Sequence, residues 1–147
     1  MPKLMKTLNN ISRCQSNYRS KKLEPERLWV GHHAFVLAIC RNEGSSQEKI
    51  ARELCLDKST VARALNRLEE KGLIERRANA ENKRELLVFP TQKMLDLLPE
   101  VRAIAKEWNA LIVSEIPEDE LSVFYSVLSR IENKAKDIIK GLEGDKK

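Results

Sequence analysis

The segment from Ser45 to Arg84 decides the fold, and it reads SSQEKIARELCLDKSTVARALNRLEEKGLIERRANAENKR. Its first part predicts a short helix, because apolar residues recur at steps of three and four and Ser45-Ser46-Gln47-Glu48 is a capping-box pattern. A tight turn follows. Asp57 then suits the N-cap of a second helix that ends before Gly72. We therefore expect two short helices joined by a tight turn.

The second helix of this pair, from Asp57 to Lys71, has two different faces at about 100° per residue. A helix that buries an apolar face and presents hydroxyl, amide and guanidinium groups on the other suits the major groove of DNA. The apolar stripe comprises Val61, Ala64, Leu65 and Leu68, and the polar stripe comprises Ser59, Arg63, Asn66 and Arg67.

Length and composition place the chain among globular proteins. Its 147 residues fit one domain, with room for an oligomerisation element. Hydrophobic residues make up 41% and charged residues 33%, and Leu and Ile are prominent in the apolar set. This favours a mainly α fold over a sheet-rich one. The sequence has no apolar run long enough to span a bilayer and no signal-peptide pattern, so we expect a cytoplasmic protein with no membrane partner.

Positive charge is segregated along the chain. The net charge is +5 and the isoelectric point is about 9.2, which alone is a weak indication of an acidic partner. Basic residues outnumber acidic ones in residues 1–27 and 47–84, however, and the reverse holds in residues 85–147. A solvated surface of mixed charge would explain the total but not this segregation.

Cysteine and histidine do not predict a metal site. Cys14, Cys40 and Cys55 are widely spaced and form no CxxC pair, so neither a disulfide framework nor a zinc cluster is indicated. His32 and His33 are adjacent and point in different directions on a helix, so we expect partial burial or surface exposure. The sequence shows no nucleotide-binding loop, catalytic triad or carboxylate pair, so we expect no enzyme, no catalytic residue and no cofactor.

Further helices and a hairpin are expected around this segment. Two strand-like runs flank a polar stretch and predict a β-hairpin with a mobile tip. Amphipathic patterns predict the helices, and one begins at Pro117, where proline and acidic residues suit a first turn. The predicted strands are Leu73–Arg77 and Arg84–Phe89, and the predicted helices are residues 3–21, residues 27–41, one after Pro90-Thr91 and one after Pro117.

The last helix carries a heptad-like seam, because its apolar residues alternate steps of three and four. A packed intramolecular core would give the same pattern. Long helices that flank a small domain usually find partner helices, and a symmetric dimer is the commonest arrangement, so we favour a homodimer. The seam comprises Leu121, Phe124, Leu128, Ile131, Ala135, Ile138 and Leu142.

Three stretches resemble the MarR family of bacterial and archaeal transcription regulators. They are SQEKIA at residues 46–51, LDKSTVAR at residues 56–63 and LEEKGLIER at residues 68–76. The resemblance extends over nearly the whole chain and is specific across about residues 31–91. It implies a winged helix-turn-helix that binds double-stranded DNA.

The resemblance also implies an organisation and a mode of action. Residues 27–90 would form the DNA-binding lobe, and residues 1–22 and 91–143 would form dimerisation helices. The family implies a homodimer that binds a palindromic operator, usually as a repressor, and is often released by a small aromatic or phenolic ligand. The hairpin would be the wing of this fold.

The expected DNA contacts come from the start of the first helix of the pair, the outer face of the second helix, and the wing. Arg63 is the best candidate for bidentate pairing with guanine, and Gln47 with the capped helix start suits phosphate oxygens. The wing would supply backbone and minor-groove contacts. A single basic residue could be solvated surface charge, but the clustering favours binding. The expected set is Ser46, Gln47, Lys58, Ser59, Thr60, Arg63, Asn66, Arg67, Arg76, Arg77, Lys83 and Arg84.

The wing departs from the family pattern at one residue. The family usually carries Asp, any residue and then Arg, and here the triplet is Asn82-Lys83-Arg84. Arg84 fills the arginine position, which would reach into the minor groove. Asn82 replaces the carboxylate that would brace the hairpin through an ion pair, which suggests a mobile wing.

Two alternative functions remain open. One branch of the family senses peroxides through a cysteine in its first helix, and Cys14 lies there, but it falls on the expected buried stripe, where cysteine is commonly a small hydrophobe. The chain could also be a helical interaction module that has lost DNA binding, although such a module would not need Arg63 or Arg84. Trp29 and Trp108 are expected in the core, with an effector pocket as the alternative.

Overall fold

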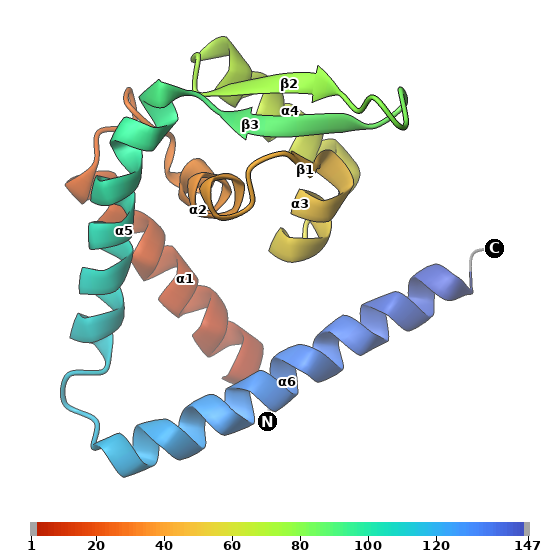
Figure 1. Ribbon diagram of the computed structural model, residues 1–147. Coiled ribbons are helices and arrows are strands. Elements are labelled where there is room, and N and C mark those ends of the chain that lie inside the picture. The colour runs from red at the N-terminus through yellow and green to blue at the C-terminus, as the bar shows by residue number, and fades with distance from the viewer. Residues whose placement is uncertain (1–2, 146–147) are drawn as a thin grey trace. The chain divides into compact units, whose positions relative to one another are not determined.

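We describe residues 3–145 of a computed structural model (Figure 1). The chain divides into two compact units, the first ending at Trp108 and the second beginning at Asn109, and each is described by itself. The expected mainly α fold with a small antiparallel sheet is confirmed. Its elements are α1 (Lys3–Lys22), η1 (Val30–His32, a 3-10 turn), α2 (His33–Arg41), β1 (Ser45–Ser46), α3 (Gln47–Leu54), α4 (Lys58–Glu70), β2 (Ile74–Ala78), β3 (Leu86–Pro90), α5 (Gln92–Ile112) and α6 (Glu118–Gly144).

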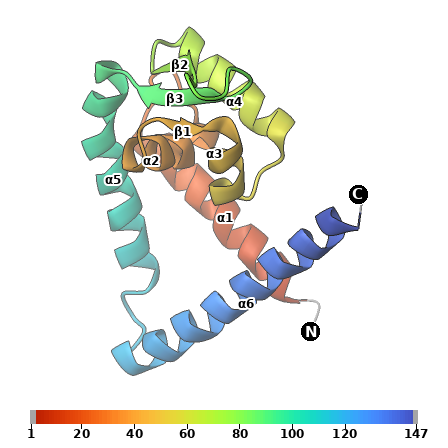
Figure 2. The same ribbon diagram turned by 45° about the vertical axis from the view of Figure 1, so that its right-hand side comes forward.

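The small sheet has three antiparallel strands in the order β1-β3-β2. The β2–β3 hairpin is the predicted wing, and its tip extends past α3 in Figure 1. Figure 2 shows the same sheet from another side. Strand β1 was not predicted. It pairs Ser45 with Val88, and the amide of Gly44 donates to the carbonyl of Val88 at 2.9 Å. These bonds tie the start of α3 to the wing.

Gly44 makes this connection possible. Its φ is +79°, in the left-handed region, and a Cβ there would lie 3.0 Å from the ring of Phe89. A side chain would therefore be strained by the backbone and crowded by the ring. Gly44 does not directly terminate the preceding helix, because α2 already ends at Arg41 with Asn42 as its C-cap.

Helix α4 crosses α3 in the expected arrangement. The small side chain of Ala51 is buried where the two helices approach, and the predicted apolar stripe of α4 faces the core. Burying a large aliphatic side chain contributes about 1.5–3 kcal/mol, so this stripe orients α4 and leaves its opposite face to solvent. The buried stripe residues are Val61, Ala64, Leu65 and Leu68.

The C-terminal end of α4 is fixed to the start of α5. Gly72 takes a φ of +71° and ends the helix as predicted. The hydroxyl of Thr91 donates to the carbonyl of Gly72 at 2.6 Å, and Nζ of Lys93 donates to the carbonyl of Lys71 at 2.7 Å. Backbone carbonyls left open at the helix end are thus satisfied by neighbouring side chains.

The predicted helix over residues 27–41 begins later than expected. Residues 24–28 form a turn, in which the amides of Arg27 and Leu28 both donate to the carbonyl of Glu24. Trp29 is extended, with φ −60° and ψ 136°, and α2 begins only at His33. The glycine at position 31 disfavours a continuous helix here, which explains the difference.

The second unit contains α6 and the end of α5. Helix α6 begins after Pro117, and its first turn holds Glu118, Asp119 and Glu120, which the positive end of the helix dipole favours. Among the described residues of α6 only Leu121 is buried, so the rest of the heptad-like seam lacks a packed core. No helix within residues 3–145 is long and apolar enough to cross a membrane.

Candidate DNA-binding surface

The start of α3 is capped by Ser46. The Ser46 hydroxyl accepts from the amide of Lys49 at 3.2 Å, so the N-cap is Ser46 and not Ser45, with which the expected capping-box pattern begins. The third helical residue is Lys49, and Glu48 therefore does not complete a capping box. Glu48 instead forms an ion pair with Lys58 at 3.2 Å, joining the first turns of α3 and α4.

The outer face of α4 is polar and exposed, as the sequence predicts. Ser59, Arg63, Asn66 and Arg67 all lie on the surface. Arg63 carries a guanidinium whose Nη2 donates to the hydroxyl of Thr60 at 3.2 Å. This face therefore offers hydrogen-bonding groups of the kind that contact base edges.

Asp57 organises the N-terminal turn of α4. Its Oδ1 accepts from the Thr60 amide at 2.8 Å and from the Ser59 hydroxyl at 2.6 Å. Its Oδ2 accepts from the Thr60 hydroxyl at 2.6 Å. The hydrogen bonds from Ser59 and Thr60 hold the pKa of Asp57 well below its usual range, so the group remains a carboxylate.

A network around Arg76 joins three elements. Arg76 of β2 donates through Nε and Nη2 to the carboxylate of Glu69, both at 3.0 Å. Its Nη2 also donates to Oδ1 of Asn66 at 2.7 Å, and its Nη1 donates to Oε1 of Gln47 at 3.1 Å. The ion pair raises the pKa of Arg76 and lowers that of Glu69.

This network changes the expected roles of Gln47, Asn66 and Arg76. All three were expected to contact DNA, and the structure turns them toward each other, with the Arg76 side chain only 17% exposed. Glu69, which completes the network, was not singled out from the sequence. Its only signal is a position on α4 three residues beyond Asn66, on the same helix face.

Two further arginines stack on aromatic rings. Arg67 lies over the ring of Trp29 with its Cζ 4.9 Å from the ring centroid, and Trp29 is 54% exposed. The expected core position of Trp29 is therefore wrong, because the extended backbone at that residue leaves the ring on the surface. Arg77 lies over Phe89 at 4.4 Å and also forms an ion pair with Glu75 at 3.1 Å.

Side-chain amides close the wing tip, residues 79–85. Asn79 donates through Nδ2 to Oε2 of Glu85 at 2.8 Å, and its amide donates to the Glu85 carbonyl at 2.9 Å. Oδ1 of Asn82 accepts from the amide of Arg84 at 3.2 Å. Asn82 thus braces the turn through a neutral hydrogen bond where the family usually has an ion pair. Lys83 and Arg84 lie exposed beside it, and the mobility of the tip stays a prediction.

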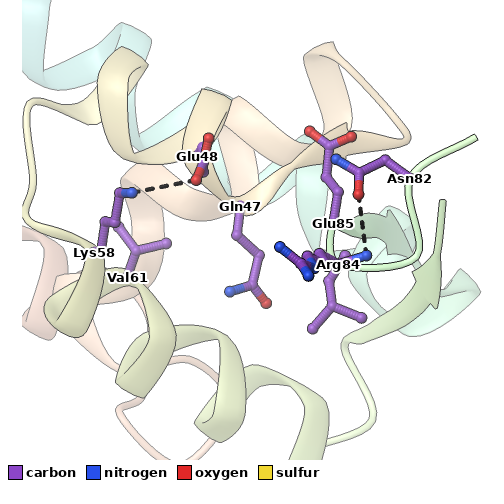
Figure 3. A pocket seen from close by; sticks show the side chains of 8 residues that line it. Gln47, Glu48, Lys58, Val61, Asn82, Arg84 and Glu85 are labelled. Atoms are coloured by element: carbon purple, nitrogen blue, oxygen red, sulfur yellow. Dashed lines mark hydrogen bonds and ion pairs between the residues drawn. The ribbon is translucent and has the colours of Figure 1, made fainter.

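A cleft of about 280 Å³ lies between the wing tip and the first turns of α3 and α4 (Figure 3). Lys58 and Glu48 lie on one side of it, Asn82 and Glu85 on the other, and Gln47 points between them. Its charged side chains have both signs: Lys58 and Arg84 are positive, and Glu48 and Glu85 are negative. The lining residues are Gln47, Glu48, Lys58, Val61, Asn82, Arg84, Glu85 and Leu86.

One of the three cysteines departs from expectation. Cys14 is exposed on α1, so its expected place on a buried stripe is wrong, because no residue of α1 is buried. Cys55 is exposed in the turn between α3 and α4, where its φ of +53° occupies a position that glycine would favour. Cys40 is half-buried in α2, and burial raises the pKa of its thiol.

Both histidines are buried, which corrects the expectation of partial burial or exposure. Their exposed fractions are 6% for His32 and 1% for His33, because the start of α2 lies inside the core of the first unit. Burial, together with the charge of Arg19, lowers the pKa of His33 to about 4. No group of three or more His, Cys, Asp or Glu residues in the described part of the chain could hold a metal ion.

Trp108 lies half-buried in the first unit. Its ring contacts the ring of Tyr18 from α1, with the centroids 5.3 Å apart. An ion pair between Lys22 and Glu107 at 2.9 Å lies beside this contact. Trp108 thus serves packing between α1 and α5, as the sequence favoured.

Comparison with known proteins decides the family. The MarR family model matches residues 32–86. A solved structure of MarR is 30% identical to this chain, covers 92% of each chain and has a TM-score of 0.78. The chain belongs to the MarR family. Its winged helix-turn-helix comprises α3, α4 and the wing, with α4 as the recognition helix.

Other relatives agree with this assignment. A MarR-family regulator from Listeria monocytogenes, solved in complex with 26mer DNA, is 28% identical, covers 93% of this chain and 91% of its own, and has a TM-score of 0.86. The HTH-type regulator YybA of Bacillus subtilis is 26% identical over 131 residues, which is 89% of this chain and 87% of YybA. The relatives are transcriptional regulators and not enzymes. This MarR-family protein is a DNA-binding transcriptional regulator.

Proposed function

We propose that this regulator is a homodimer that binds a palindromic operator and represses transcription. The observation that carries the proposal is the exposed polar face of α4 beside the basic tip of the wing. In helix-turn-helix docking a recognition helix enters the major groove, and a dimer contacts two half-sites about 10 base pairs apart. Palindromy of the operator would then mirror the two-fold symmetry of the dimer.

Exposed apolar side chains support the homodimer. Helix α1 exposes Leu4, Met5 and Ile11, and α6 exposes most of its heptad-like seam, including Phe124 at 51% and Leu142 at 59%. Exposed apolar residues repeated along a helix in this way usually mark an interface, and a second copy is the commonest partner. Residues 1–22 and 91–143 would therefore act as the dimerisation helices, and residues 27–90 as the DNA-binding lobe.

Some of the proposed residues would contact DNA directly, and others would hold the contacting elements in place. Arg63 would pair with a guanine, and Lys58 and Arg84 would contact phosphates or the minor groove. Gln47, Asn66 and Arg76 would act mainly by fixing the wing against α3 and α4. The other proposed contacts to the duplex are Ser46, Ser59, Thr60, Arg67, Arg77 and Lys83.

Release by a small aromatic or phenolic ligand completes the proposal. PcaV of Streptomyces coelicolor, solved in complex with its natural ligand, shares the fold with a TM-score of 0.77 at 19% identity. A ligand that binds the DNA-free state more tightly would shift the dimer away from the operator. Repression then ends when the ligand accumulates.

Selection of bound duplexes from a random pool tests the proposal. The purified protein should enrich a motif with two inverted half-sites, and a panel of aromatic acids should contain members that reduce binding. In a reporter strain, deletion of the gene should raise expression from a promoter that carries the motif. Failure to enrich any sequence at low salt would contradict the proposal and favour an interaction module that has lost DNA binding.

Redox sensing through Cys14 is a second candidate, favoured by one observation. Cys14 is exposed on α1 and is therefore accessible to peroxide. Operator binding should then fall after mild peroxide treatment in the parent protein and not in Cys14→Ser. Equal binding before and after treatment would dispose of this candidate and leave the repressor proposal intact.

A further inference from the structure

Asp57 accepts both hydroxyl protons at the start of the recognition helix. Its Oδ1 and Oδ2 each lie 2.6 Å from one hydroxyl oxygen, that of Ser59 and that of Thr60 respectively. An ionised carboxylate carries no proton and can only accept, so both hydroxyls must donate. The low pKa of Asp57 keeps it ionised over the ordinary pH range.

This arrangement fixes what Ser59 can offer to DNA. Its single proton is used by Asp57, so the exposed oxygen presents only lone pairs. In the major groove, the exocyclic amino groups of cytosine and adenine are donors, whereas N7 and O6 of guanine and O4 of thymine are acceptors. Phosphate oxygens are acceptors as well. Ser59 in this state matches an amino group and repels the other partners.

The hydroxyl group of Thr60 links Asp57 to Arg63. This hydroxyl donates to Asp57 and accepts from Nη2 of Arg63 at 3.2 Å. One guanidinium N–H is thereby hydrogen-bonded within the helix, and the guanidinium has further N–H donors for a base. This hydrogen bond already restricts the side chain of Arg63, so less conformational entropy is lost when Arg63 binds DNA. It therefore favours pairing with a guanine at one position of the half-site.

We propose that Asp57 is a specificity-determining positioning residue, which makes Ser59 a pure acceptor for a base amino group and holds Arg63 for a guanine. Each half-site would then contain a guanine and, at a neighbouring base pair, a cytosine or adenine whose amino group faces Ser59. The inference rests on the proposed function, because it requires α4 to enter the major groove. It adds to that function the chemistry of the bases read.

Asp57→Asn tests the inference with little change in shape. Asparagine is also a good N-cap and can still accept from the Thr60 amide. Its Oδ1 can keep both the Thr60 amide and the Ser59 hydroxyl, whereas its Nδ2 donates where Oδ2 accepted. The Thr60 hydroxyl proton therefore becomes free, and the hydroxyl no longer holds Arg63 in the same way. Duplexes selected from a random pool by the parent, Asp57→Asn and Ser59→Ala give base preferences at every position of the half-site.

The control is Glu48→Gln. Glu48 lies near the same surface and pairs with Lys58, so its neutralisation removes a similar charge without touching the hydroxyls. Both neutralised variants should bind all duplexes more tightly, since repulsion from phosphates falls. Only Asp57→Asn should alter a base preference, namely that for guanine, which separates the positioning of Arg63 through Thr60 from the effect of net charge.

We expect the parent to prefer adenine or cytosine at one position by about three- to tenfold, which corresponds to the net free energy of one hydrogen bond. Ser59→Ala should lose this preference. Asp57→Asn should keep it, because Oδ1 still accepts from Ser59, but should weaken the guanine preference of Arg63. Glu48→Gln should keep both preferences, and an Asp57→Asn variant with an unchanged guanine preference would contradict the role of Asp57 in holding Arg63. If Asp57→Asn fails to fold, Ser59→Ala still decides the role of the acceptor. A parent that selects a motif without an amino-base preference, or a Ser59→Ala variant that keeps it, overturns the inference alone. A parent that selects no motif refutes the proposed function instead.

Discussion

Arg76 of β2 and Glu69 of α4 form a two-point ion pair, with Nε–Oε2 and Nη2–Oε1 distances of 3.0 Å each. The planar guanidinium matches the carboxylate at both oxygens, which fixes the angle between the two groups. Because Arg76 also bonds Gln47 and Asn66, the root of the wing is held to both helices of the helix-turn-helix. Arg76 therefore adds a side-chain link between α3, α4 and the wing to the backbone bonds of the sheet.

Arg76→Ala should weaken both folding and DNA binding. Loss of several charge-assisted hydrogen bonds at a mostly buried site should lower the free energy of unfolding by about 1–3 kcal/mol, measured by urea denaturation. Arg77→Ala is the matched control, because Arg77 pairs with Glu75 in an exposed position and such pairs contribute only about 0–1 kcal/mol. Equal losses in the two variants would show that the Arg76 network does not brace the wing.

Arg63→Ala should lose discrimination more than affinity for random DNA. The guanidinium can pair with a guanine at two points, so its removal should reduce the preference for the operator by about 1–3 kcal/mol. Competition between the selected operator and a duplex with that guanine replaced measures the effect. An unchanged sequence preference in Arg63→Ala would show that Arg63 does not recognise a base.

Arg84→Ala should make the salt dependence of operator binding shallower. A cation that displaces one counterion from DNA contributes about 0.9 to the slope of log affinity against log salt. Arg76→Ala offers the contrast, since a residue that acts by position should lower affinity at an unchanged slope. If the slope is the same in the parent and in Arg84→Ala, Arg84 does not touch the phosphates or the groove.

His33 should make the fold less stable in mild acid. Its pKa is about 4 in the folded protein and its ordinary value is 6.5, so the unfolded chain binds the proton more readily between these values. Stability from this group is complete above about pH 6.5 and is lost as the pH falls toward 4. The free energy of unfolding should fall by about 2 kcal/mol from pH 7 to pH 5. His33→Leu should remove most of this fall, and an unchanged profile would contradict the assignment.

Local pattern was sufficient to predict the recognition helix. Three predicted features of α4 are observed: the apolar stripe around Leu65 and Leu68, the N-cap at Asp57 and the helix end at Gly72. Each of these features depends only on residues that are close to it in the sequence. The seam of α6 was likewise visible from its period, although a period alone does not tell a core from an interface.

Features that depend on distant partners were missed. Arg76 finds Gln47 across 29 residues, and no local pattern marks that contact. Strand β1 has only two residues, too few for an alternating signal. The burial of His33 and the exposure of Cys14 depend on which elements cover them, which periodicity along one helix does not reveal.

The central claim is that two copies of this chain hold one duplex through α4 and the wing. Light scattering of the protein, alone and with a duplex that carries the selected motif, tests it most directly. We predict a dimer of the 16.9 kDa chain in both cases, with two chains per duplex in the complex. A single chain that leaves the duplex free even at low salt would contradict the account.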